Sequence, residues 1–386
     1  MSLKIDLFKV YNALFCLLLI AIPTSEAIKQ ISLYPLILLG FFIIFKNKIE
    51  IKLDFFSSAL LAYALFFALS SVINAEAKNM LDPLRSALFF VVIYTIGFER
   101  INLKSLILSL FTGYFIAYLM GIYKVFVGGA DLFELKSVGY VNTSAIFSLF
   151  MLILSLGVFK LKIFGDNFWG KALPIFMIFI TFSAIILSAS RTVIYLLPLL
   201  FVLCLFVIFD IKPRKKDLLI CAVILGVLGL FTFILTLLPH ERILYKMSLG
   251  GTFLGTRINF FVAAFYAWLD NPFFGIGGEN FIKIDNSIYF PNSPEPHAPH
   301  AHNVILNLLA TTGIFTTLFY ICLEVFAFFK FAQNYKISAF IGAALLVVIF
   351  SNIASIVELT FHSENLLLTL FIFALAFNAI KKEAKQ

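Results

Sequence analysis

Twelve apolar stretches, each close to the length needed to cross a lipid bilayer, dominate this sequence. A transmembrane helix needs about 17 to 25 mostly apolar residues, and a helix satisfies its own backbone polar groups, as lipid requires. We therefore predict an all-α, polytopic integral membrane protein with about twelve transmembrane helices. The predicted spans cover residues 10–25, 31–45, 55–73, 84–98, 105–127, 142–161, 172–189, 192–209, 218–238, 303–329, 338–357 and 364–380.

Composition supports a membrane protein and argues against other classes. Of the 386 residues, 62% are hydrophobic and only 13% are charged, which is more apolar surface than a soluble domain can bury. The net charge of +8 follows the membrane, so it indicates no nucleic-acid partner. The four cysteines lie in apolar runs without C-x-x-C spacing, which argues against a disulfide framework or a thiolate zinc site. We expect residues 1–386 to form a single transmembrane domain in contact with membrane lipids.

The distribution of lysine and arginine predicts the orientation of the chain. Residues 1–27 resemble a signal sequence, and we expect this segment to remain as the first span. If the N-terminus is cytoplasmic, nineteen of the 29 lysines and arginines fall on the cytoplasmic side, with some in every cytoplasmic loop. This is the positive-inside pattern, and it predicts that both termini are cytoplasmic.

The longest polar interruption, residues 239–302, lies outside under this topology, between the ninth and tenth spans. Loops of this length usually carry function or some structure of their own. Within it, residues 257–269 form an apolar run that is too short to span and ends at Asp270-Asn271-Pro272. We predict an interfacial helix here, inserted in a large external loop that contains short helices.

The external loop ends in a histidine-rich stretch that runs directly into the tenth span. Residues 296–303 carry three of the five histidines, and Asn303 is a good N-cap for the following helix. Gly313 comes eleven residues after His302, about three helical turns, so it should lie below His302 on the same face. We expect the missing side chain to let a neighbouring transmembrane helix pack closely beneath the histidine.

Two arginines share the outer face with His302. Arg191 belongs to the outer turn between the seventh and eighth spans, and Arg257 begins the external helix. A single arginine at a membrane boundary is often an anchor to lipid phosphate, and this interpretation stays open for each of them. Together, two forked guanidinium groups beside a helix N-terminus favour a diphosphate ligand. Arg85, just inside the fourth span, is a weaker candidate.

His302 is suited to act as a neutral base. The positive end of the helix disfavours protonated imidazole, and imidazole accepts a proton near neutral pH. A metal site competes with this interpretation, because His297, His300 and His302 lie close together in the sequence. However, they lie in a loop without a nearby cysteine or an H-E-x-x-H helix, so the pattern favours no metal.

The histidine motif and the outer arginine resemble the bacterial O-antigen ligase family, which belongs to a wider group with O-antigen polymerases and O-linked oligosaccharyltransferases. His302-Asn303, followed after nine residues by Gly313 and after two more by Thr316, matches the ligase signature of this family. Ser190-Arg191, after a membrane run, resembles the Ser-Arg element of the family.

Two further stretches extend the resemblance over residues 139 to 316. Gly255-Thr256-Arg257 and the glycine turn at residues 275–277 are similar to the external-loop arginine of the family and the turn after it. Residues 139–145, which include Asn142, resemble another family stretch, although Tyr140 and Thr143 stand where many members have histidine.

The resemblance implies an enzyme of the bacterial inner membrane whose active site faces the periplasm. It implies transfer of a glycan from undecaprenyl diphosphate to a sugar hydroxyl of lipid A-core, with no metal and no other cofactor. His302 would remove the proton of the acceptor hydroxyl, while Arg191 and Arg257 would hold the donor diphosphate. The residues that the sequence offers as support for this site are Asn303, Gly313, His300, Asn142 and Arg85.

Other functions remain open on the sequence. An O-antigen polymerase would use the same donor with a second lipid-linked glycan as acceptor, and an O-linked oligosaccharyltransferase would use a protein hydroxyl. The latter relatives tend to carry an additional C-terminal region, which we do not expect here. A polysaccharide or lipid transporter is the alternative from a different class, but transporters usually place ionisable residues near mid-membrane, often in inverted repeats. In this sequence the charges gather at one face and no repeat is visible.

Overall fold

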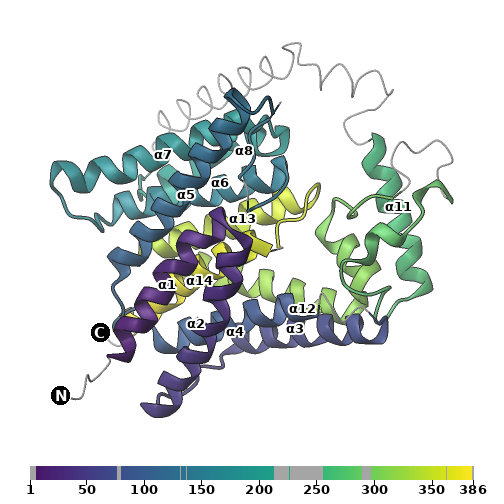
Figure 1. Cartoon of the computed structure of the whole chain (residues 1–386), viewed down its shortest axis with the longest axis horizontal. Helices are drawn as coiled ribbons and strands as arrows, with labels where there is room; N and C mark the ends of the chain where they lie inside the picture. The colour runs from purple at the N-terminus through teal and green to yellow at the C-terminus, as the bar shows by residue number, and fades with distance from the viewer. Residues whose placement is uncertain are drawn as a thin grey trace.

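The computed structural model describes residues 6–75, 80–130, 132–135, 137–212, 226, 255–288, 297–361 and 363–384. Within these ranges the chain forms α-helices and two short 3-10 helices, without a strand (Figure 1). Eight helices are long and apolar enough to cross a membrane, and two shorter apolar helices accompany them. The prediction of an all-α, polytopic membrane protein is confirmed.

The helices follow the predicted spans closely. The first eight are α1 (Leu7–Thr24), α2 (Glu26–Lys46), α3 (Phe55–Ile73), α4 (Leu81–Ile96), α5 (Leu103–Phe126), α6 (Val141–Lys160), α7 (Phe168–Ser188) and α8 (Arg191–Val207). The later elements are α11 (Gly255–Asp270), η2 (Asn280–Lys283), η3 (Asn286–Ile288), α12 (Val304–Asn334), α13 (Ala339–Ser355) and α14 (Ser363–Glu383). Every predicted span except the ninth corresponds to one of these helices. Of the ninth, residues 218–238, only residue 226 is described.

Short polar side chains define where many of the helices begin. In each case, a side-chain oxygen accepts a hydrogen bond from a backbone N–H of the first turn. That N–H would otherwise have no partner within the helix. Ser25 ends α1 and also caps α2, where its hydroxyl accepts from the N–H of Ile28, so the chain reverses over one residue. The other N-caps of this kind are Asp6, Asp54, Asn102, Asn167, Asn303 and Ser338.

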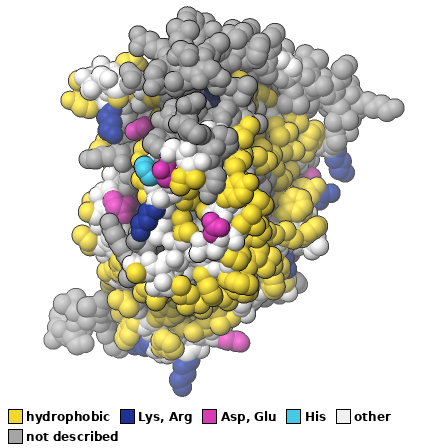
Figure 2. All heavy atoms as spheres, turned by 90° about the vertical axis from the view of Figure 1, so that its right-hand side faces the viewer, with side chains coloured by type: hydrophobic (Ala, Val, Ile, Leu, Met, Phe, Trp, Pro, Cys, Tyr) yellow, Lys and Arg dark blue, Asp and Glu magenta, His cyan; other side chains and the backbone are white. Residues whose placement is uncertain are grey.

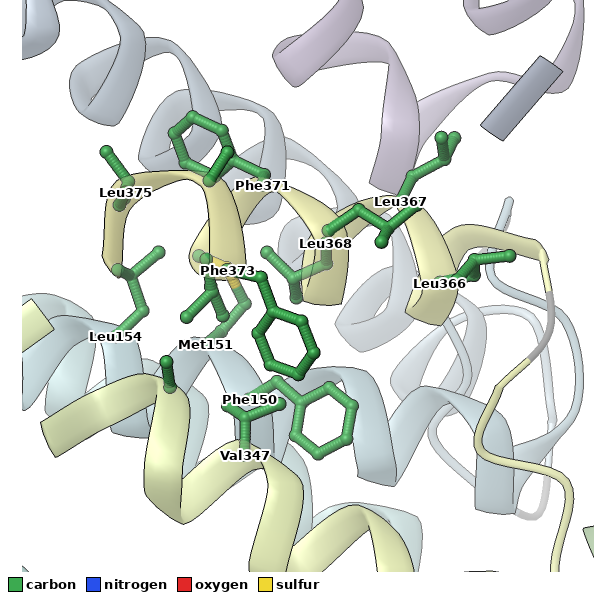
Figure 3. Close-up of a cluster of buried hydrophobic side chains, with 14 of the residues drawn as sticks. Phe150, Met151, Leu154, Val347, Leu366, Leu367, Leu368, Phe371, Phe373 and Leu375 are labelled. Carbon is green, nitrogen blue, oxygen red and sulfur yellow. The ribbon is translucent and has the colours of Figure 1, made fainter. Parts of the chain in front are cut away.

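Helices α6, α13 and α14 form the centre of the bundle (Figure 3). Helix α6 is the most enclosed of the candidate spans, because 89% of its most apolar 18 residues are buried, against 39% for α1 and for α7. Figure 3 shows Phe150 and Met151 of α6 lying with Val347 of α13 and Phe373 of α14. Such close packing leaves little room for the central helices to shift. It therefore fixes the positions of α6 and of the turn between α13 and α14.

Helix α12 is broken at Gly313, whose φ of 77° and ψ of −173° are not helical. In an unbroken helix, the N–H of Ile314 would donate to the carbonyl of Ala310. Here Ile314 donates to the carbonyl of Pro272 at 2.9 Å, and Ala310 accepts from the N–H of Ile276 at 3.0 Å. A break of this kind is tolerated in a membrane protein where neighbouring protein satisfies the freed backbone groups. Gly313 therefore divides α12 into a short segment that follows His302 and a longer segment that continues to Asn334.

The prediction that a transmembrane helix packs against Gly313 is wrong. A Cβ atom on Gly313 would lie 2.1 Å from the carbonyl oxygen of Phe273 and 2.5 Å from the nitrogen of Phe274. The neighbour is thus the turn that follows α11. Gly275 in this turn has φ of +61°, and a Cβ there would lie 2.4 Å from the carbonyl carbon of Thr311. The two glycines let the backbones of the turn and of α12 approach each other directly.

Helix α3 lies beside α12 and holds the same turn (Figure 1). The hydroxyl of Ser70 donates to the carbonyl of Phe274 at 2.5 Å, and the side-chain amide of Asn74 donates to the carbonyl of Gly275 at 3.2 Å. Helix α11 packs against α12 at this end of the molecule. Figure 2 shows this end, where broad hydrophobic areas are interrupted by a few charged side chains. The predicted helix at residues 257–269 is present as α11, while its interfacial location stays a prediction.

Candidate functional site

A buried glutamate, Glu358, is the point where four parts of the chain meet. It lies in the turn between α13 and α14, and only 5% of its side chain is exposed. Its Oε1 accepts from Nδ2 of Asn142 at 2.5 Å and from Nη2 of Arg257 at 2.6 Å. Its Oε2 lies 3.5 Å from Nδ1 of His302. One carboxylate therefore links the beginnings of α6, α11 and α12 to the α13–α14 turn.

Arg257 comes from the first turn of α11, and its side chain is 18% exposed. The pair with Glu358 is a charge-assisted hydrogen bond in a largely desolvated place, where such bonds are strong. A guanidinium group has five N–H donors, so the bond through Nη2 leaves other donors for a ligand. Arg257 can thus be held by Glu358 and still bind an anion.

His302 is fixed at the entrance to α12 in a left-handed conformation, with φ of 55°. This conformation is uncommon outside glycine. Asn303 caps the helix by accepting from the N–H of Leu306 at 2.9 Å, and its amide donates to the carbonyl of Ile356 at 3.1 Å. The second bond ties the start of α12 to the turn that carries Glu358. The position of His302 is therefore set by its own backbone as well as by its side-chain contacts.

Two rings pack against the imidazole of His302. The ring of Phe260 from α11 stacks on it at a centroid distance of 5.7 Å, and His300 meets it edge to face at 4.2 Å. The Nδ1 atom of His302 is buried and makes no hydrogen bond with the described residues. His300, His302 and Glu358 offer three possible metal-ligand atoms that lie within 4.8 Å of one another. The sequence pattern favours no metal, because no cysteine or H-E-x-x-H helix accompanies the histidines, whereas the structure adds Glu358 as a third possible ligand.

Asn142 extends the site to α8 and to Arg191. The hydroxyl of Ser190 donates to Oδ1 of Asn142 at 3.0 Å, while Nδ2 of Asn142 donates to Glu358. Ala189, at the turn from α7 to α8, has φ of 50°, and Arg191 is the first residue of α8. Arg191 is partly exposed and has no ion pair within the described part of the chain. It follows Ser190, the first member of the hydrogen-bonded series Ser190–Asn142–Glu358.

Arg85 belongs to a different group of side chains. Its guanidinium donates to Gln30 at 2.6 Å and pairs with Asp82 at 3.1 Å. A neighbouring buried ion pair joins Lys29 of α2 to Glu364 of α14, and Lys29 and Arg85 line the same small pocket. None of the described contacts of Arg85 reaches Glu358, so the structure does not bring Arg85 into the group around His302.

The third histidine of the motif, His297, lies apart from the other two. It is exposed and near Asp285. Ser287 donates to Asp285 through its hydroxyl at 2.5 Å and through its backbone N–H at 2.9 Å. These hydrogen bonds lower the pKa of Asp285, and His297 acts in the same direction. Only His300 and His302 of the motif therefore belong to the Glu358 site.

Glu358 is the residue that sequence reasoning missed. It stands in a short connection between two apolar helices, without a motif around it. Its one available signal was topology, since the predicted orientation puts residues 358 and 302 on the same outer side. A carboxylate on the same predicted side as Arg191, Arg257 and His302 is therefore a candidate partner for them.

A comparison with known protein families matches the part of the chain that carries most of this site. A family model described as O-antigen ligase matches residues 176–321, a range that includes Arg191, Arg257 and His302 and ends before Glu358. A search of curated proteins gave no match. The match supports an enzyme of the general O-antigen ligase or polymerase type, with a lipid-linked glycan as substrate. The predicted resemblance is confirmed: residues 176–321 of this polytopic membrane protein match the O-antigen ligase family.

Proposed function

We propose that this protein is an O-antigen ligase, which transfers a glycan from undecaprenyl diphosphate to a sugar hydroxyl of lipid A-core. The observation that carries the proposal is the convergence on Glu358. A single buried carboxylate holds Arg257 and faces His302. These are the cation and the base that glycosyl transfer from a diphosphate needs, and they come from different elements of the family segment.

In the proposed reaction, an oxygen of the acceptor sugar attacks the anomeric carbon of the donor glycan. The bond from that carbon to the diphosphate oxygen breaks, and undecaprenyl diphosphate leaves with the bonding electrons. Negative charge therefore develops on the leaving oxygen, where fixed cations stabilise the transition state. Arg257, through the donors that Glu358 leaves open, and Arg191, with no described ion pair, supply that charge. The donor is already activated at the bond between the anomeric carbon and the diphosphate, so no nucleotide is needed.

His302 takes the proton of the acceptor hydroxyl in this scheme. A neutral imidazole carries one N–H, and a proton on Nδ1 points toward the Oε2 of Glu358, 3.5 Å away. The lone pair then lies on Nε2, where it accepts the acceptor proton. The carboxylate stabilises the imidazolium that forms, as in other histidine–carboxylate pairs. Glu358 is a positioning residue here, because it acts through His302 and Arg257.

The proposed setting is the periplasmic face of the bacterial inner membrane, with both termini in the cytoplasm. The site is built where α6, α8, α11 and α12 begin and where α13 turns into α14. Under the positive-inside topology all these ends are external. An outer-leaflet site meets the donor and lipid A-core without either polar headgroup crossing the membrane.

Reconstitution of the purified full chain tests the proposal. Purified undecaprenyl-diphosphate-linked glycan is supplied with lipid A-core, with a second lipid-linked glycan, or with an acceptor protein. We expect glycan on lipid A-core in the first mixture, seen as a mass shift of the acceptor, and an equal release of undecaprenyl diphosphate. Transfer only to the second glycan identifies a polymerase, and transfer only to the protein identifies an oligosaccharyltransferase. Either outcome overturns the ligase assignment.

A further inference from the structure

Three metal-ligand groups converge on one side of the site around Glu358. The imidazoles of His300 and His302 meet at a centroid distance of 4.2 Å, and Oε2 of Glu358 lies 3.5 Å from Nδ1 of His302. The ligand atoms of the three residues all lie within 4.8 Å of one another. The Nδ1 of His302 makes no hydrogen bond among the described residues, although it is buried. When the imidazole proton is on Nε2, the Nδ1 lone pair and the Glu358 carboxylate face each other, which favours a cation between them.

The donor set matches divalent zinc in kind and in spacing. Zinc takes histidine nitrogen and carboxylate oxygen at about 2.0–2.2 Å, which places tetrahedral ligands roughly 3.4 Å apart. The 3.5 Å between His302 and Glu358 already fits this arrangement, and His300 offers a third ligand atom within 4.8 Å of the other two. Three protein ligands leave a fourth position for water.

The other oxygen of Glu358 is already fixed. Its Oε1 accepts from Asn142 and Arg257, so Oε2 is held in one orientation toward His302. Second-layer partners of this kind orient metal ligands and typically change metal affinity by about 10- to 100-fold. The positive charge of Arg257 lowers the affinity for a cation, which fits a reversible ligand better than a permanent one.

We propose that His300, His302 and Glu358 bind a zinc-type divalent ion that reversibly inhibits the enzyme. The regulatory part rests on the proposed function, in which His302 is the base. A metal on Nδ1 takes the lone pair of that nitrogen, and the single N–H of the neutral imidazole then has to be on Nε2. Nε2 then has no lone pair to accept the proton of the acceptor hydroxyl, so proton transfer stops. The ion also engages the carboxylate that stabilises the imidazolium.

Metal binding to the full chain in detergent tests the site without any substrate. Zn²⁺ is titrated by calorimetry, and Co²⁺ serves as a spectroscopic probe through its visible absorption. We expect one saturable site per chain, with affinity at least about tenfold lower in His300→Ala, His300→Gln and Glu358→Gln. The control is His297→Ala, which removes an exposed histidine of the same loop outside the cluster and should leave the affinity unchanged. No saturable binding, or equal binding by wild type and both His300 variants, overturns the site.

An activity measurement then tests inhibition separately. We expect Zn²⁺ to reduce glycan transfer by the wild type at concentrations that fill the site. In His300→Ala, the concentration needed should rise by the same factor as the dissociation constant, relative to the metal-free rate of that variant. Binding without inhibition overturns the regulatory part. If glycan transfer itself fails, the proposed function falls, while the calorimetric result still decides whether the metal site exists.

Discussion

Arg257 and Glu358 lie 101 residues apart in the sequence, and the Nη2 of the arginine is 2.6 Å from Oε1 of the glutamate. This ion pair joins the first turn of α11 to the turn between α13 and α14. It ties α11 directly to the turn that faces His302. Because the pair is also part of the proposed site, the same contact serves architecture and chemistry.

Substitution of Glu358 by glutamine should separate these two roles. The amide keeps the shape of the side chain but removes the charge that holds Arg257 and stabilises imidazolium at His302. We expect folded protein whose kcat for glycan transfer falls about a hundredfold, within the usual range for loss of acid–base assistance. Steady-state kinetics with lipid-linked donor measure this. Glu99→Gln, an exposed glutamate outside the site, is the control and should match wild type. Wild-type kcat in Glu358→Gln would remove the positioning role.

His302→Ala should remove the proposed general base of glycan transfer. General-base assistance contributes about 10²- to 10⁴-fold, so we expect a rate loss in that range with the protein still folded in the membrane. The measurement is transfer of glycan to lipid A-core, together with size-exclusion chromatography of the purified variant. His297→Ala provides a matched control in the same loop, because His297 is exposed and lies outside the site. Normal transfer by His302→Ala would end the base assignment.

Lysine in place of Arg257 or Arg191 should weaken use of the donor. Lysine keeps the charge but lacks the forked donors that grip two phosphate oxygens. In Arg257→Lys, the bond to Glu358 also has to be remade. We expect the KM for the lipid-linked donor to rise about tenfold, with the KM for the acceptor unchanged, as measured by varying each substrate in turn. Arg100→Lys, at an exposed residue, is the control. An unchanged donor KM in both variants would contradict the diphosphate role.

Gly313→Ala should destabilise the protein strongly. The new Cβ would lie 2.1 Å from the carbonyl oxygen of Phe273, and the backbone would keep φ at +77°. The backbone at φ of 77° and ψ of −173° lies in a region used almost only by glycine, which costs an alanine about 1–3 kcal/mol, and the clash with backbone adds to this cost. Gly129 is a matched control, because its φ is +70° but a Cβ there meets nothing within 4 Å. Thermal unfolding in detergent should show a much larger fall in Tm for Gly313→Ala than for Gly129→Ala, and equal falls would refute the contact.

The buried pair of Lys29 and Glu364 offers a test of charge burial. Lys29→Met leaves the Glu364 carboxylate enclosed without its partner, which should cost about 3–5 kcal/mol of stability. The double change to Lys29→Met with Glu364→Leu removes both charges and should recover much of that loss. Thermal unfolding measures both. Lys162→Met breaks an exposed pair with Asp166 and should change Tm little. A double variant as unstable as Lys29→Met would show that the charge is not the cause.

The helices could be predicted from sequence because length and hydrophobicity alone decide them. The apolar run at residues 142–161 predicts a span, but nothing in it indicates that α6 is the most buried of the candidate spans among the described residues. The partners of each helix could not be predicted, since apolar faces of similar composition do not specify one another. The break in α12 could not be predicted either, because Gly313 stands in a continuous apolar run that is typical of one unbroken helix.

The candidate site could be predicted only in part. His302, Arg257 and Asn142 belong to recognisable stretches, and the structure brings them together. Arg85 is a weaker candidate just inside the fourth span, and its guanidinium contacts Gln30 and Asp82 instead. The contact between Arg257 and Glu358 depends on the arrangement of helices in space. The spacing of the two residues along the chain does not predict this contact.

Because α12 is broken at Gly313, the number of residues between His302 and Gly313 determines where His302 lies relative to the turn after α11. Ala310 and Ile314, on either side of the glycine, are hydrogen-bonded to the turn after α11, and the side chain of Asn303 donates to the carbonyl of Ile356. With both ends fastened, the short helical segment between them works as a spacer of set length. One residue inserted there would rotate His302 by about 100° and lift it by about 1.5 Å. The imidazole would then face away from Glu358, even though every side chain of the site was still present.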